Sequence, residues 1–288
     1  MSSVASLVDD LQGSTTGDAP PLITVELRPP RAHLEGGRAI DAWIDLNRAI
    51  RRFTLDGRHL FLTDDAVGQA EEENLAHLAG NLDDDVPRGR VVPFLTSKHS
   101  LEYCLLYAER AHAQGFSALT VLGGDTSVGR PRCFPHAYLL RERIREHVPA
   151  LQLGGWANPF RPAEEQAGFL ADPRATADFF LTQVVSHHDA GRIETLFAEL
   201  HRREVQTPGL VGIFHYRSAN PSTLEQLSRF LPVPAEQLTR EFDAGASPEE
   251  ITARSIRAVL DAGARGVYLS NLALGSAPRT LRRIISLL

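Results

Sequence analysis

Leu22-Ile23-Thr24-Val25-Glu26-Leu27-Arg28-Pro29-Pro30 is the stretch that decides the fold. Its β-branched and aliphatic residues predict a buried strand over residues 22–27. The two prolines cannot continue a central ladder, so they turn the chain out of the sheet. Glu26 is then a carboxylate on an apolar strand, where charged groups are rarely found without a role. We expect Glu26 near the C-terminal mouth of whatever the strand helps to build.

The rest of the chain repeats a short apolar strand followed by a helix. The further expected strands are 60–63, 91–96, 118–122, 151–155, 178–185, 210–214 and 266–270. The expected helices are 36–53, 71–82, 100–114, 135–147, 163–170, 190–204, 222–242 and 248–262, with one more at the end of the chain. This alternation predicts an α/β protein, a (β/α)8 TIM barrel with helices over its outer face. An open doubly wound sheet is the alternative, but no G-x-G-x-x-G follows the first strand.

Composition and length favour one globular domain over residues 21–288, preceded by a flexible N-terminal arm over residues 1–20 that is rich in Ser, Gly, Asp and Thr. The net charge of -6 gives no support to binding of nucleic acid or of a membrane surface, since both need basic blocks. We expect neither a signal peptide nor a spanning helix. Cys104 and Cys133 form no disulfide framework, which fits a cytoplasmic protein. No exposed apolar stripe stands out, so we expect a monomer.

Five segments at the expected strand ends carry a recognisable pattern. They are E-L-R-P-P at 26–30, P-F-L-T at 93–96, V-L-G-G-D at 121–125, A-D-F-F-L-T-Q at 177–183 and G-I at 212–213. In their joint order and spacing they resemble the methylenetetrahydrofolate reductase family. The resemblance implies a TIM barrel that reduces 5,10-methylenetetrahydrofolate to 5-methyltetrahydrofolate. In that family, hydride from a nicotinamide normally passes through bound FAD.

The resemblance also implies roles for individual residues. By position, Glu26 matches the general acid, Asp125 the aspartate beside flavin and folate, and Gln183 the glutamine that contacts the pterin. Thr63 falls where the family has a flavin-contacting threonine. We count Gln183 and Thr63 as substrate-binding residues, and Glu26 and Asp125 as catalytic.

Three aromatic and three basic residues complete the predicted site. Trp156, Phe94 and Phe160 are expected to form stacking walls for pterin and nicotinamide. The three cations near predicted strand ends are assigned to anionic groups, Arg28 to the substrate and both Lys98 and Arg217 to the dinucleotide.

The chain departs from the family where the flavin would bind. Phe94 replaces a flavin-contacting histidine, and Gly123 removes the arginine of an R-G-D segment. Ala171-Asp172-Pro173 stands where the family has basic residues for the FAD diphosphate. A diphosphate is held by Arg or Lys, and Asp172 would repel it. Because several contacts to one ligand are lost together, we expect FAD to be absent and NADH to give its hydride directly.

The chemistry assigned to this site needs a proton donor. Protonation at N10 opens the five-membered ring of methylenetetrahydrofolate to an N5 iminium that accepts hydride. Burial would raise the pKa of Glu26 and suit it to that step. Asp125 would stabilise the positive charge that develops on the folate.

Three other functions remain open. The protein could be a FAD-containing reductase of the same family, a Schiff-base aldolase acting through Lys98, the only lysine, or a folate-binding protein without catalysis. The choice between NADH and NADPH is open too. The run His187-His188-Asp189 is not expected to hold a metal, because adjacent residues point apart and no third ligand is evident. A helix N-cap at Asp189 is the expectation there.

Overall fold

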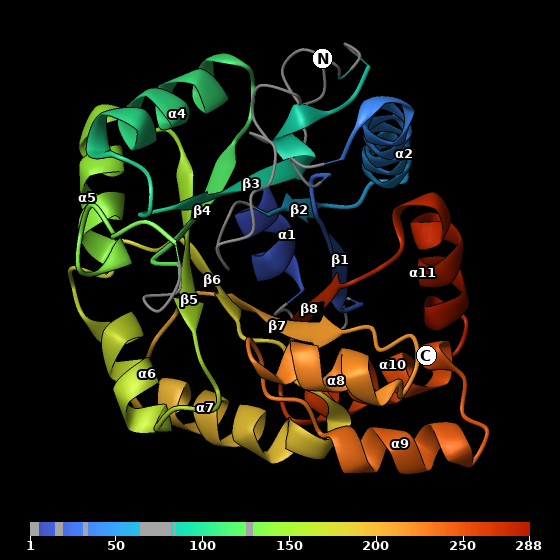
Figure 1. Cartoon of the computed structure of the whole chain (residues 1–288). Coiled ribbons are helices and arrows are strands. Elements are labelled where there is room, and N and C mark those ends of the chain that lie inside the picture. The colour runs from blue at the N-terminus through green and yellow to red at the C-terminus, as the bar shows by residue number, and fades with distance from the viewer. Residues whose placement is uncertain (1–5, 15–19, 31–33, 64–81, 83–84, 125–128) are drawn as a thin grey trace.

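The computed structural model describes residues 6–14, 20–30, 34–63, 82, 85–124 and 129–288. Its centre is a closed barrel of parallel strands, β1 to β8, in which each strand pairs with the next and β8 returns to β1 (Figure 1). The strands are β1 Leu22–Leu27, β2 Leu60–Leu62, β3 Val91–Thr96, β4 Ala118–Leu122, β5 Gln152–Ala157, β6 Phe179–Thr182, β7 Gly209–Phe214 and β8 Gly266–Ser270. The expected TIM barrel is confirmed.

Helices surround the strands (Figure 1). They are α2 Gly36–Leu55, α4 Leu101–Ala113, α5 Ala137–His147, α6 Ala163–Ala171, α7 Ala190–Arg202, α10 Pro248–Asp261 and α11 Ala277–Ile285. Short 3-10 turns are η1 Arg88–Arg90, η2 His187–Asp189 and η3 Leu274–Ser276. The helix expected over residues 71–82 lies outside the described residues, Leu82 excepted. None of the helices in the described ranges is both long and apolar enough to cross a membrane.

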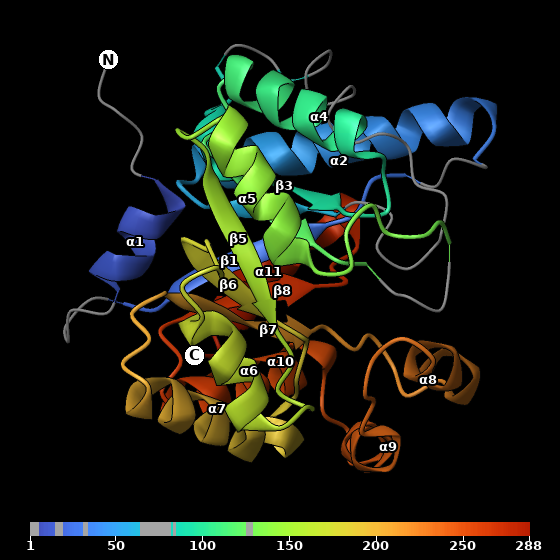
Figure 2. The same ribbon diagram turned by 90° about the vertical axis from the view of Figure 1, so that its left-hand side faces the viewer.

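One expected helix is wrong. Residues 222–242 form two helices, α8 Pro221–Ser228 and α9 Ala235–Asp243, rather than one. Pro232 and Pro234 separate them, because proline lacks the N–H that an α-helix needs and its ring clashes with the preceding turn. As a result, α8 and α9 form a pair beyond the end of β7, apart from the helices that surround the strands (Figure 2).

Two apolar layers hold the barrel together. Alternate side chains of each strand face outward and pack under the helices, as Val25 and Leu27 do on β1. The inward side chains form a second cluster in which Phe61 lies at ring-centroid distances of 5.9 Å from Phe94 and 6.0 Å from Tyr268. Aromatic rings therefore fill the middle of the barrel. In the described part of the barrel, this leaves the ends rather than the middle open to a ligand.

The N-terminal end of the barrel is covered by α1, Leu7–Gly13. Part of the expected flexible arm is thus a helix, because Leu7 and Leu11 are fully buried against the barrel interior. Asp10 Oδ2 lies 2.8 Å from His59 Nε2, just before β2, and Gln152 Nε2 at the start of β5 donates to Ser6 Oγ at 2.9 Å. Figure 2 shows α1 at one end of the barrel and α8 at the other.

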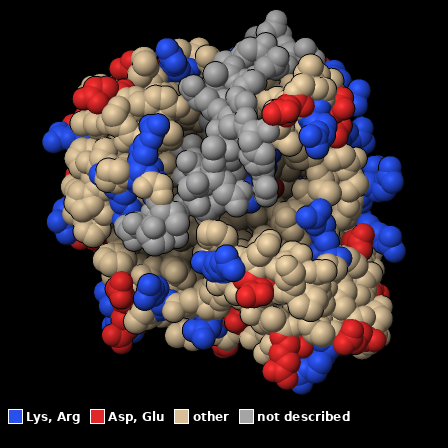
Figure 3. All heavy atoms as spheres, viewed as in Figure 1, with Lys and Arg blue, Asp and Glu red and all other residues tan. Residues whose placement is uncertain are grey.

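Charges are mixed on the face seen in Figure 3. Lys and Arg alternate with Asp and Glu over the described part of that surface, without one continuous basic field. This distribution agrees with the net charge of -6 and offers no broad track for a polyanion.

Candidate functional site

Glu26 stands near the C-terminal end of β1 and shares the inward face of that strand with Thr24. Its Oε1 accepts a hydrogen bond of 2.8 Å from Ser270 Oγ, at the end of β8. Burial raises the pKa of the Glu26 carboxyl and outweighs the opposing effects of the Ser270 hydrogen bond and the Arg28 charge. The side chain is nevertheless partly exposed. The barrel therefore presents at its mouth a carboxyl group that holds its proton more tightly than an exposed glutamate does.

Two predicted aromatic residues belong to the inward cluster. The Phe94 side chain on β3 is 3% exposed and packs against Phe61, so it belongs to the aromatic layer that closes the barrel interior beneath the mouth. Trp156 on β5 packs against the same cluster and is partly exposed. Of these two rings, Trp156 offers more surface to a ligand.

Gln183 and Thr63 follow directly after strands and are tied to neighbouring ones. The Gln183 backbone N–H donates to Ala157 O at 2.9 Å, and its side-chain Oε1 accepts from Val184 N at 2.9 Å. Thr63 is buried, and its backbone N–H donates to Leu27 O, at the end of the strand that bears Glu26, at 3.1 Å. Both residues therefore lie at the same end of the barrel as Glu26.

The predicted cations differ in their surroundings. Arg28 is exposed beside the end of β1, close enough to lower the pKa of Glu26. Lys98 is only 6% exposed, and its Nζ donates to Arg130 O at 3.4 Å. Its aliphatic chain lies over Gly124, where an added Cβ would stand 2.8 Å from Lys98 Cε. Lys98 is thus held against the loop after β4.

Arg217 borders a cleft at the ends of β7 and β8. The cleft has a volume of about 230 Å³ and is also lined by Phe214, Tyr216 and Asn271. Asn271 adopts a left-handed backbone with φ of +71°, and its Nδ2 donates to His215 O at 3.0 Å. Asn271 is the neighbour of Ser270, so the cleft adjoins the residue that binds Glu26.

Two predicted residues do not join this group. Phe160 packs against the outer apolar cluster, and its ring centroid lies 5.1 Å from Arg192 Cζ on α7. It is therefore not placed with the inward aromatic rings. Asp125 lies outside the described residues, although Gly123 and Gly124 before it are described.

Sequence reasoning missed a guanidinium at the mouth. Arg132 donates from Nη2 to Gly124 O and from Nη1 to Pro135 O at 3.2 Å. A Cβ added to Gly123 would stand 2.9 Å from Arg132 Cζ, so the glycine makes room for this group. A positive charge therefore lies beside position 123 although the residue there is not an arginine. Only the fold could reveal it.

The two adjacent histidines also differ from expectation. His187 and His188 do not point apart, since both Nε2 atoms reach Oε1 of Glu241 on α9, at 3.0 and 2.7 Å. Asp189 occupies the N-cap position of α7 as expected, but its Oδ2 accepts from Ser186 Oγ at 2.9 Å rather than capping that helix. The metal interpretation that was set aside gains the third ligand it lacked.

No family model and no curated protein matches the sequence. Among solved structures with the same fold is an uncharacterized protein from Clostridium thermocellum that binds two copies of 5-methyl-5,6,7,8-tetrahydrofolic acid. It is 15% identical, with a TM-score of 0.68, over 96% of this chain and 97% of that chain. Another is the aldolase QR15, 13% identical with a TM-score of 0.49 over 94% of this chain and 99% of that chain, a likeness too low to carry an argument. At these identities the similarity shows the fold.

Proposed function

We propose that this protein reduces 5,10-methylenetetrahydrofolate to 5-methyltetrahydrofolate with hydride taken directly from NADH, without bound flavin. The observation that carries the proposal is Glu26, a carboxyl with a raised pKa at the C-terminal mouth of the barrel. Enzymes with this fold act at that end. The folate class is supported by the strand-end segments and by the neighbour of 0.68 TM-score that binds 5-methyltetrahydrofolate.

Glu26 supplies the proton that the reaction consumes. Its protonated carboxyl donates to N10 of the substrate, the N10–methylene bond breaks, and an N5 iminium results. NADH supplies hydride to the methylene carbon and leaves as NAD⁺. The Glu26 carboxylate, which is partly exposed, then regains a proton from water. Ser270 holds Oε1 in place through this cycle by its 2.8 Å hydrogen bond.

The other residues at the mouth would orient the substrate. Trp156 presents a partly exposed ring on which a pterin can stack. Gln183 has an amide that can donate and accept on the pterin edge, while Thr63 lies beside the end of β1. Asp125 keeps its proposed role of stabilising positive charge on the folate. Arg217 in its cleft, Lys98 and Arg28 are the proposed partners of the anionic groups.

The residues at the expected diphosphate position do not fit FAD. Arg174 is paired with Asp172, from Nε to Oδ1 at 3.0 Å and from Nη2 to Oδ2 at 2.7 Å. These contacts and the Arg174 backbone N–H lower the pKa of Asp172 to about 2, so it stays anionic. The guanidinium also lies over the Tyr138 ring, 5.3 Å from its centroid. A diphosphate at this position would face a carboxylate, with the nearby cation already engaged.

An aldolase acting through Lys98 is the second candidate. One observation favours it: the side chain is almost wholly buried near the mouth, as a Schiff-base lysine would be. Borohydride trapping of a carbonyl substrate on Lys98 would support that reaction.

The proposed function is tested by mixing purified protein with methylenetetrahydrofolate and NADH while recording the visible spectrum. We expect NADH oxidation with matching formation of 5-methyltetrahydrofolate and no flavin band. A stoichiometric flavin would instead indicate a FAD-containing reductase. Tight folate binding without NADH oxidation would indicate a binding protein, and either result would overturn the proposal.

A further inference from the structure

Three potential metal ligands from two distant segments converge beside the end of β6. His187 and His188 lie in η2, and Glu241 lies on α9. One ligand atom from each residue falls within 4.8 Å of the other two. The two imidazole rings are 3.9 Å apart between centroids, and both direct Nε2 at the same oxygen of Glu241. We propose that these residues bind a divalent transition-metal cation, with Zn²⁺ as the first candidate.

The hydrogen bonds around His187 leave its Nε2 lone pair facing Glu241. Ser255 Oγ donates to Ile251 O at 3.0 Å, so the same oxygen accepts from His187 Nδ1, also at 3.0 Å. In the neutral ring Nδ1 therefore carries the proton, and Nε2 is an acceptor. An acceptor nitrogen 3.0 Å from a carboxylate oxygen is repulsive unless a positive charge lies between them. A metal ion supplies that charge, and it serves His188 at the same time.

The carboxylate has its own outer partner. Arg254 Nη2 lies 2.6 Å from Glu241 Oε2, while the two histidines approach Oε1. Metal-bound histidines commonly donate their second nitrogen to a neighbour, and ligating carboxylates are hydrogen-bonded in turn. Ser255 matches the first role, and Arg254 forms an ion pair with the carboxylate. The cluster therefore has both the ligands and the surrounding contacts of a metal site.

Two imidazoles and one carboxylate suit Zn²⁺ and other borderline cations better than Ca²⁺ or Mg²⁺, which prefer oxygen. Three protein ligands with one open position are the pattern of reactive zinc sites rather than of structural ones. Zn–N and Zn–O bonds of about 2.0–2.2 Å place tetrahedral ligand atoms about 3.3–3.6 Å apart. The Nε2–Oε1 separations of 3.0 and 2.7 Å need to lengthen by less than an ångström.

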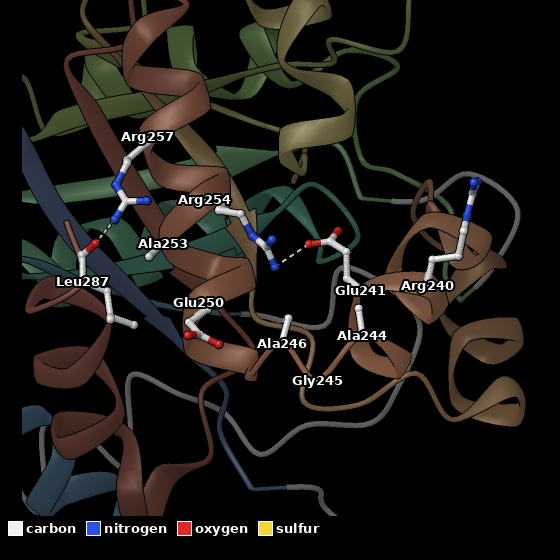
Figure 4. Close-up of a pocket in the computed structure, with 10 residues that line it drawn as sticks. All are labelled: Arg240, Glu241, Ala244, Gly245, Ala246, Glu250, Ala253, Arg254, Arg257 and Leu287. Carbon is white, nitrogen blue, oxygen red and sulfur yellow. Dashed lines mark hydrogen bonds and ion pairs between the residues drawn. The ribbon is translucent and has the colours of Figure 1, made fainter.

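A cavity borders the carboxylate of this cluster. It has a volume of about 660 Å³, lies between α9, α10 and Leu287 near the end of the chain, and is bordered by Glu241 and Arg254 (Figure 4). Arg240 and Arg257 line it as well, so an anion could accompany the metal there. Figure 4 shows the Glu241 carboxylate directed at Arg254 across this space. The Glu241 side chain, 14% exposed, thus lies at the edge of this cavity.

The test uses the untagged full-length chain after removal of metal with a chelator. Titration calorimetry with ZnCl2 should give one equivalent per chain, and Co²⁺ should give a visible d–d spectrum of four- or five-coordinate metal. His188→Ala and Glu241→Gln should each weaken Zn²⁺ binding by at least about tenfold, and Ser255→Ala by about 10–100-fold. Circular dichroism would establish that each variant is folded.

Matched controls remove similar groups elsewhere. His201→Ala takes an exposed histidine from α7, and Glu236→Gln takes an exposed carboxylate from the same helix as Glu241. Both should bind Zn²⁺ as the parent does. The proposal is overturned if the parent chain takes up no Zn²⁺. A protonated histidine paired with the Glu241 carboxylate would then account for the short Nε2–Oε1 distances. It is equally overturned if His188→Ala and Glu241→Gln bind as tightly as the controls. These readouts do not depend on the reductase activity.

Discussion

Glu26→Gln removes the acidic proton of the site and leaves the shape of the side chain almost unchanged. The amide oxygen can still accept from Ser270 Oγ, which lies 2.8 Å from Oε1 in the parent chain. The amide cannot supply the proton that opens the substrate ring. General acids contribute about 10²–10⁴-fold to rate, so kcat should fall by that factor. The loss corresponds to about 2.7–5.4 kcal/mol of transition-state stabilisation at about 1.36 kcal/mol per tenfold.

Although kcat falls, the folding stability of the Glu26→Gln variant should rise above that of the parent chain. Because burial raises the folded pKa of Glu26 above its unfolded value, the folded state binds the proton more tightly. Stability is therefore lost as pH rises from the unfolded pKa through the folded pKa. The amide of the Glu26→Gln variant does not titrate, so the variant gains on the parent across that window. The gain is about 1.4 kcal/mol for each tenfold difference in proton affinity between the folded and unfolded parent.

Two measurements test these expectations for the Glu26→Gln variant. Initial rates of NADH oxidation at saturating methylenetetrahydrofolate give kcat, and urea unfolding at acid and alkaline pH gives the stability difference. Glu146→Gln, which removes a carboxylate exposed on α5, should change neither quantity. A Glu26→Gln enzyme with kcat within about threefold of the parent, worth less than about 1 kcal/mol, would refute Glu26 as the acid.

Three further substitutions test separate parts of the account. Ser270→Ala removes a hydrogen bond that lowers the Glu26 pKa, so the alkaline limb of the kcat/KM profile should move to higher pH; an unmoved limb would contradict this link. Leu11→Ala empties a fully buried position in α1 and should cost about 2–5 kcal/mol in urea unfolding while kcat is kept, and a negligible cost would mean that α1 does not seal the barrel. Lys98→Met should raise the KM for NADH but keep kcat; complete loss of activity, with a borohydride-trapped adduct in the parent, would favour the aldolase.

The barrel could be predicted because each strand carries its own apolar signal. Val91–Thr96 was expected and is observed with the same bounds. The break between α8 and α9 had a local signal in Pro232 and Pro234, but the helical spacing of apolar residues on both sides obscured it. Helix α1 has only 7 residues, too few to be stable alone, and it forms because the barrel buries Leu7 and Leu11.

The candidate site was predictable only where one residue was informative by itself. Glu26 stood out as a carboxylate in an apolar strand, but its partner Ser270 lies 244 residues away and carries no local signal. His187 and His188 were expected to diverge as strand neighbours do, whereas a 3-10 turn brings both rings to Glu241, 53 residues beyond His188. Contacts between distant segments are set by the closure of the barrel.

The source of the hydride in the product methyl group tests the central claim most directly. A single turnover in ordinary water with NADH deuterated at the transferring C4 position separates the two routes. Direct transfer predicts one deuterium in the methyl group of 5-methyltetrahydrofolate for each NADH consumed. Transfer through a reduced flavin, whose N5 hydrogen exchanges with water, would give a methyl group depleted of deuterium and would contradict the account.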